Sequence, residues 1–71
     1  MTLEEFQAEV LQAMNQRPSQ YRMGQAVFNY IDEKYGVARY VQFVEGVDCF
    51  YDDEQIIPFI YSSYAVLNRM I

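Results

Sequence analysis

The sequence has no histidine and only one cysteine, and these absences restrict its chemistry. Because Cys49 stands alone, no disulfide can form within the chain. Without histidine, the chain lacks a common zinc ligand and the usual base of a nucleophilic site. Ser62 and Ser63 therefore have no evident base to activate them. We predict that the protein is not an enzyme and uses no cofactor.

Basic residues are also few, because five Lys and Arg stand against ten Asp and Glu, for a net charge of -5. A protein that binds nucleic acid neutralises phosphates with clustered bases. Here the bases are scattered, at Arg17, Arg22, Lys34, Arg39 and Arg69. Nucleic-acid binding is therefore disfavoured, unless Arg17, Arg22 and Arg39 converge in space. An acidic surface suits a soluble protein or one with a basic protein partner.

We expect neither a signal peptide nor a membrane span. Glu4 and Glu5 lie where a signal peptide would carry basic residues. The segment 56–71 is apolar, but it is shorter than the roughly 20 residues of a transmembrane helix and contains Pro58 and Arg69. Together with a single, reduced cysteine, these features predict a cytoplasmic protein.

The composition favours one small folded domain over residues 1–71. Hydrophobic residues make up 52% of the chain and charged residues 21%, which is enough to build a core. Chains this short often gain further stability from disulfides, metals or a partner subunit. Since the first two are disfavoured here, the remaining supports are self-association and tight helix packing, and we favour a homodimer.

Two amphipathic helices are predicted in the first half of the chain. The first begins with a capping box, in which Thr2 and Glu5 each accept the other's backbone N–H, and ends before Pro18. Its apolar face comprises Leu3, Phe6, Val10, Leu11 and Met14. The second helix should run from a cap at Ser19 to Tyr35, with Gly36 as its stop. Its expected core face comprises Met23, Ala26, Val27, Phe28, Tyr30 and Ile31.

Gly24 lies inside the second predicted helix, where glycine costs about 1 kcal/mol relative to alanine. A glycine in this position most often permits the close approach of another backbone segment. We therefore expect a second segment of the chain to pack directly against Gly24.

The segment 37–51 can be interpreted in two ways. As a helix that stops at Gly46, it has an apolar stripe of Val37, Tyr40, Val41 and Val44. Its β-branched and aromatic residues are also compatible with a hairpin at about 38–51, which would make the fold α+β. We favour the helix, so the predicted fold class is all-α, a compact bundle of three to four short helices.

The last predicted helix begins at an N-cap, Asp52, and contains Pro58, which predicts a kink or a short preliminary turn. Its two apolar faces are Ile60, Tyr64, Leu67 and Ile71 on one side, and Phe59, Val66 and Met70 on the other. A helix with two apolar faces is either central or shared with a partner. We therefore treat the second set as the candidate dimer face.

A polar strip and an acidic loop form the candidate functional region. Their residues are Arg22, Gln25, Asn29, Asp48, Tyr51, Asp52 and Asp53. We interpret the strip as a structural clamp, in which Arg22 pairs with an acid of the loop while Gln25 and Asn29 bind its backbone. The alternative is that these residues bind an outside partner. At least one of Phe50 and Tyr51 should anchor the loop in the core, because exposing both is costly.

Two motifs resemble a pattern in small uncharacterised proteins that bacteriophages and prophages encode. The motifs are Arg22-x-Gly24-Gln25-Ala26-x-Phe28-Asn29 and Asp48-x-Phe50-Tyr51-Asp52-Asp53, and the resemblance spans roughly residues 18–61. Similar sequences often have proline where this chain has Cys49. The resemblance implies a phage or host-cytoplasm setting and supplies no established activity.

The seven tyrosines and four methionines favour a protein partner, because both residue types suit interfaces. The leading hypothesis is a small non-enzymatic protein-interaction module. The phage resemblance adds the role of a modulator of a host or defence protein. Two alternatives are a nucleic-acid-associated accessory protein and, more weakly, a metal-binding protein that uses the carboxylates of the loop.

Overall fold

The computed structural model describes residues 1–70, which form four helices and no strand. The elements are α1 (Leu3–Asn15), α2 (Met23–Tyr35), α3 (Ala38–Tyr40) with its continuation η1 (Val41–Glu45), and α4 (Ile56–Arg69) with a preceding 3₁₀ turn, η2 (Asp53–Gln55). The predicted all-α class is therefore confirmed, and the hairpin alternative is wrong. None of these helices combines the length and the apolar character that crossing a membrane requires.

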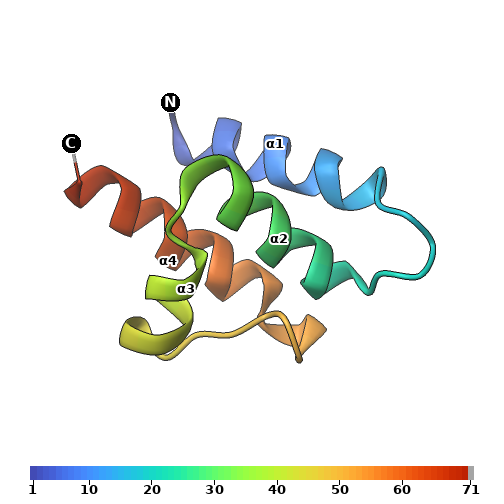
Figure 1. Cartoon of the computed structure of the whole chain (residues 1–71). Coiled ribbons are helices and arrows are strands. Elements are labelled where there is room, and N and C mark those ends of the chain that lie inside the picture. Colours follow the sequence, from blue (N-terminus) through green and yellow to red (C-terminus); the bar gives the residue numbers. More distant parts are fainter. Residues whose placement is uncertain (71) are drawn as a thin grey trace.

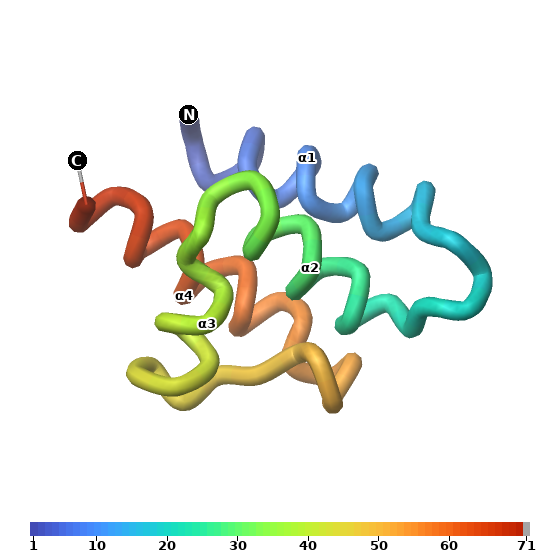
Figure 2. The backbone as a smooth tube through the Cα atoms, in the orientation of Figure 1, coloured from blue at the N-terminus to red at the C-terminus, as the bar shows by residue number. Residues whose placement is uncertain are grey.

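The helices α1, α2 and α4 pack around one core, and α3 with η1 closes one end of it (Figure 1). The tube in Figure 2 follows the long loop from η1 back past the start of α2 to η2. The radius of gyration is 11.0 Å, as expected for a compact chain of this length, which should measure about 11 Å. The first turn of α2 and the loop before α4 therefore lie side by side, although about 25 residues separate them in the sequence.

Helix α1 begins with the predicted capping box. The Thr2 backbone N–H donates to Glu5 Oε1 at 2.7 Å, and the Glu5 N–H donates to Thr2 Oγ1 at 3.1 Å. Phe6 and Val10 are fully buried, and Leu11 packs against the core beside them. The predicted apolar face of this helix is thus confirmed.

Helix α2 begins later than predicted. Its N-cap is Arg22, and Ser19 instead lies in a turn in which the Tyr21 N–H donates to the Pro18 carbonyl at 3.1 Å. The prediction of Ser19 as N-cap is wrong, because proline starts a separate turn here. The helix ends as predicted at Gly36, whose φ of 72° is in the left-handed region.

The core face of α2 is rotated relative to the prediction. The buried residues of this helix are Gly24, Val27, Phe28 and Ile31. Met23 is exposed, and Ala26 and Tyr30 are only partly buried. The face is rotated because the loop before α4 packs directly against Gly24, so the side of the helix that contains Gly24 is buried.

The third helix changes its winding after Tyr40. η1 is a π-helical turn, and it ends at Gly46, which has a φ of 74° as the predicted stop requires. Val37 and Val41 are buried as expected, whereas Tyr40 and Val44 are exposed. The extra residue of the π turn moves the last part of the segment out of the helical register on which the predicted stripe was based.

Helix α4 lies in the middle of the fold, packed against α1, α2 and η1. Pro58 is its third residue, in the first turn, where a backbone N–H has no helical acceptor to lose, and η2 is the predicted preliminary turn. Phe59 and Val66 are buried within one chain, so assigning them to a dimer face is wrong. Met70 is 70% exposed and remains accessible. Ile71 lies outside the described residues.

Candidate functional site

The start of α2 holds the loop 47–52 through backbone contacts at Gly24. The Gly24 N–H donates to Asp53 Oδ1 at 2.9 Å, and the Cys49 thiol donates to the Gly24 carbonyl at 3.2 Å. A Cβ atom added at Gly24 would lie 2.0 Å from the Cys49 carbonyl oxygen. The predicted close approach of a second backbone segment at Gly24 is therefore confirmed.

The predicted clamp is only partly formed. Arg22 contacts the loop, but its Nη2 donates to the Phe50 carbonyl oxygen rather than to an acid. Within residues 1–70, Gln25 and Asn29 donate no hydrogen bond to the loop. Their predicted role is wrong because Asp53, through the Gly24 N–H, and Cys49, through the Gly24 carbonyl, make the contacts instead.

The acids of the loop act mainly as local caps. Asp48 Oδ1 accepts the Phe50 N–H at 2.8 Å, and Asp52 Oδ1 accepts the Glu54 N–H at 3.0 Å. In the part of the chain that the structure describes, no three of the Asp, Glu and Cys side chains are grouped so as to hold a metal ion. The loop therefore offers carboxylate charge without a metal-binding arrangement.

Cys49 is fully buried behind these contacts. Burial, with a further contribution from the charges of Asp48 and Asp53, raises the pKa of its thiol to about 12. A thiol in this state is not a nucleophile at neutral pH. Its role is to pack and to donate to the Gly24 carbonyl.

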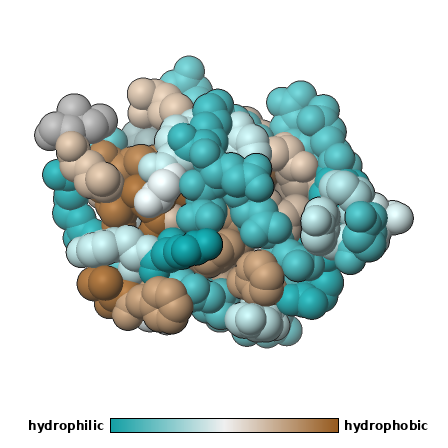
Figure 3. Space-filling model, viewed as in Figure 1, coloured by the Kyte–Doolittle hydropathy of each residue, from teal (hydrophilic) through white to brown (hydrophobic). Residues whose placement is uncertain are grey.

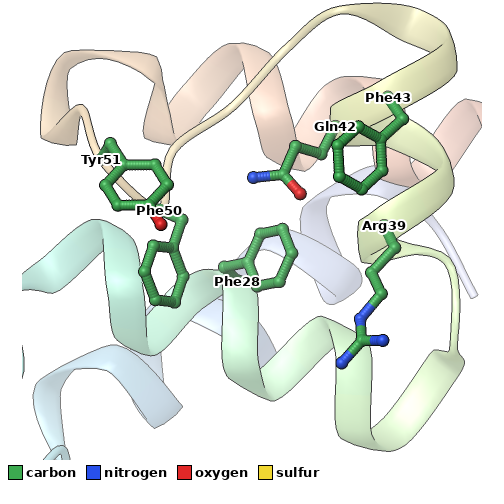
Figure 4. Close-up of a pocket in the computed structure, with 6 residues that line it drawn as sticks. All are labelled: Phe28, Arg39, Gln42, Phe43, Phe50 and Tyr51. Carbon is green, nitrogen blue, oxygen red and sulfur yellow. The ribbon is translucent and has the colours of Figure 1, made fainter.

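An aromatic groove lies between α3–η1 and the loop. The lining residues are Phe28, Arg39, Gln42, Phe43, Phe50 and Tyr51, and the space between them is about 270 Å³ (Figure 4). In Figure 4, Phe43 and Arg39 extend from the α3–η1 side, Tyr51 lies on the loop side, and the rings of Phe28 and Phe50 lie next to each other between them. We call this feature the aromatic groove.

The floor of the aromatic groove is packed, whereas its edges are open to solvent. Phe28 and Phe50 make an edge-to-face contact with centroids 5.3 Å apart. The prediction that at least one of Phe50 and Tyr51 anchors the loop is thus confirmed, and the anchor is Phe50. Tyr51 makes an edge-to-face contact with Phe50, with ring centroids 4.8 Å apart, and yet is 76% exposed. Phe43 is 79% exposed on the other side. The groove thus has an exposed aromatic side chain on each side and a packed aromatic floor.

Further apolar side chains extend this surface along the third helix. Tyr40 and Val44 are exposed on the same helical segment as Phe43. Figure 3 shows hydrophobic atoms gathered at the lower left, over the α3–η1 region, among polar surroundings. The sequence analysis did not identify Phe43 as part of an exposed apolar surface. The available signal was that Phe43 is a large apolar residue outside the predicted core stripe.

A second polar cluster, centred on Glu9, joins α1 to α2. Glu9 Oε2 accepts hydrogen bonds from Tyr30 Oη at 2.7 Å, from Lys34 Nζ at 2.8 Å and from Tyr35 Oη at 2.6 Å. The bond from Lys34, followed by those from the two tyrosines, lowers the pKa of Glu9 to about 2. Burial, followed by the bond to Glu9, raises the pKa of each tyrosine. Helical spacing alone places Glu9 on the outer face, so this cluster was not predicted.

The Glu9 cluster predicts a pH-dependent stability. Because the folded pKa of about 2 lies below the ordinary value of 4.5, the carboxylate stabilises the fold above pH 4.5, and this contribution disappears as the pH falls through 2. We expect Glu9→Gln to lose about 1 kcal/mol at neutral pH, since half of Lys34 is exposed and water screens the pair. Urea unfolding across the acid range measures this, with Glu4→Gln as an exposed control. Equal acid sensitivity in wild type and Glu9→Gln would contradict it.

The arginines do not converge on a phosphate-binding surface. Arg22 caps the start of α2, whereas Arg39 Nε lies 3.9 Å from Asp32 Oδ2, near the other end of that helix. Ten residues of α-helix separate these points by about 15 Å. Arg17 donates to the backbone carbonyls of Met14 and Tyr21.

The chain was compared with known proteins at three levels. No model of a known protein family matches it, and neither a curated protein sequence nor a solved structure shows detectable similarity to it.

Proposed function

We propose that this protein is a non-enzymatic interaction module that binds another protein through the aromatic groove. The observation that carries the proposal is the exposure of Phe43 and Tyr51, at 79% and 76%, on the two edges of one groove. Burying an aromatic side chain recovers roughly 1.5 to 3 kcal/mol, so a partner that covers both gains substantial affinity. A cluster of exposed aromatic residues usually marks a site at which another molecule binds, because aromatic side chains are enriched among the residues that dominate binding energy.

The architecture around the groove supports binding. Phe28 and Phe50 form a packed floor, and the contacts at Gly24 hold the loop in place, so the surface is ordered before a partner arrives. Phe43 lies in a π-helical turn, and such turns occur frequently at functional sites. Among the described residues that line the groove, the polar groups are Arg39, Gln42 and Tyr51, a set that suits recognition better than acid–base or nucleophilic catalysis.

The two sequence motifs suggest the biological setting of this activity. Their resemblance to bacteriophage and prophage proteins supports a role in the cytoplasm of a bacterial host. There the protein would modulate a host or defence protein by occupying one of its surfaces. The net charge of -5 keeps such a small protein soluble and disfavours a nucleic-acid target.

The experiment compares Phe43→Ala with Tyr21→Ala. Tyr21 is also exposed, but it lies in the turn between α1 and α2 and does not line the groove. In pull-downs from bacterial lysate, a partner retained by wild type and Tyr21→Ala should be lost with Phe43→Ala. Affinity for the purified partner should fall at least about 30-fold, as expected for a central aromatic anchor.

Two results would overturn the proposal. One is a set of captured proteins that Phe43→Ala leaves unchanged. The other is self-association of the wild type in sedimentation experiments that Phe43→Ala abolishes, because the groove would then be covered by a second copy of the chain. Circular dichroism of each variant checks that folding is unaffected, since Phe43 and Tyr21 are both outside the core.

A further inference from the structure

We infer that the aromatic groove binds a basic segment of its partner, with a Lys or Arg side chain lying over the exposed rings. This inference rests on the proposed function and adds the chemistry of the ligand. It is carried by two features of the groove. One is the exposure of two aromatic side chains, Phe43 and Tyr51, and the other is the sign of the charge near them.

The exposed rings are suited to a cation. Tyr51 and Phe43 stand on the two sides of the groove (Figure 4), so a side chain that enters between them meets aromatic surface from more than one direction. A cation over such a face gains about 0.5 to 1 kcal/mol at an exposed site and about 2 kcal/mol when water is excluded. A long basic side chain also covers apolar surface with its methylene groups.

The charge beside the rings is negative. The segment 47–55 contains four acids and no base: Asp48, Asp52, Asp53 and Glu54. Arg22, bonded to the Phe50 carbonyl, offsets one of these four charges, so three remain. Two of the acids, Asp52 and Glu54, are exposed in the residues that follow Tyr51.

The single base that lines the groove does not reverse this sign. Arg39 is mostly exposed, and its Nε lies 3.9 Å from Asp32 Oδ2, so the carboxylate of Asp32 offsets its charge. Glu45 is likewise paired with Arg69, with Nη2 and Oε1 2.5 Å apart. Within residues 1–70, the acids of the segment 47–55 form no salt bridge, so they are the uncompensated charges nearest to the groove in the sequence. An acidic partner would place like charges together, whereas a basic partner would be attracted.

Panning a random peptide display library on the full chain tests this inference. We expect wild type to enrich peptides with Lys or Arg next to an apolar residue, and Phe43→Ala to lose them. Enriched peptides that depend on Phe43 but are neutral or acidic would overturn the inference and leave the proposed function standing. An absence of enriched peptides, or enrichment that ignores Phe43, would overturn both. Self-association that Phe43→Ala abolishes would also overturn both, with a second copy as the occupant.

A charge variant gives a quantitative check with the selected peptide. The double substitution Asp52→Asn and Glu54→Gln removes two charges and retains the cap of η2, because asparagine is as good an N-cap as aspartate. We expect the affinity at low salt to fall about five- to tenfold, and the difference to shrink as salt is added. The control, Glu4→Gln with Glu33→Gln, makes the same change in net charge away from the groove. Equal losses in both double variants would overturn the inference.

Discussion

Gly24→Ala is expected to destabilise the protein by about 3 kcal/mol or more, because the added methyl group would lie 2.0 Å from the Cys49 carbonyl oxygen. No rotamer change can relieve a contact between a Cβ atom and a backbone oxygen, so α2 and the loop must move apart. That movement also weakens the Asp53 and Cys49 hydrogen bonds to Gly24. Because domains of this size are stable by only about 5 kcal/mol, the variant should retain only about 2 kcal/mol, and a few per cent of it should be unfolded without denaturant.

Gly36→Ala is the matched control for this experiment. A Cβ atom there meets no other atom within 4 Å, and the only cost is the left-handed φ of 72°. That conformation costs a non-glycine residue about 1 kcal/mol. Urea unfolding followed by circular dichroism compares the two variants. If Gly24→Ala proves no less stable than Gly36→Ala, the close packing of the loop on α2 does not exist in solution.

Phe59→Ala is expected to cost about 3 to 5 kcal/mol, as for other large-to-small substitutions of a fully buried phenylalanine. Phe59 contacts the ring of Phe28, with centroids 5.6 Å apart, so its removal leaves a cavity beneath the aromatic groove. The loss should be independent of protein concentration, because the side chain is buried within a single chain. Urea unfolding at two protein concentrations measures both quantities.

The same substitution at Phe43 provides the control. Phe43 is exposed, so Phe43→Ala should change the stability by no more than about 0.5 kcal/mol. A small effect of Phe59→Ala, together with dissociation of a dimer, would instead restore the interface predicted from the sequence. The pair therefore separates a core residue from a surface residue with identical chemistry.

Much of the fold could be predicted because its signals are local. The capping box of Thr2 and Glu5 and the stops at Gly36 and Gly46 depend on neighbours within a few residues, and all are present in the structure. Gly24 could be interpreted correctly because a glycine inside a helix destabilises that helix unless close packing compensates for the loss. The start of α2 was misplaced, since Ser19 has the right chemistry for a cap but Pro18 begins a turn before it.

The candidate site was less predictable because it is formed by contacts between distant segments. The floor of the groove joins Phe28 to Phe50, and no periodicity in the sequence relates these residues. Exposure of Val44 depends on the π winding of η1, which a pattern based on α-helical spacing cannot anticipate. The prediction that Arg22 contacts the loop was correct, but the acceptor is the Phe50 carbonyl oxygen instead of an acid.

The π turn of η1 also affects how this protein can diverge. A π turn bonds each residue to the fifth along, so η1 accommodates one residue more than an α-helical turn would. A deletion of one residue between Val41 and Gly46 could close the segment with ordinary α-helical bonds and leave Val37 and Val41 in the core. Different side chains would then line the aromatic groove. Single-residue insertions and deletions at this point could therefore alter binding specificity in descendants while the fold is conserved.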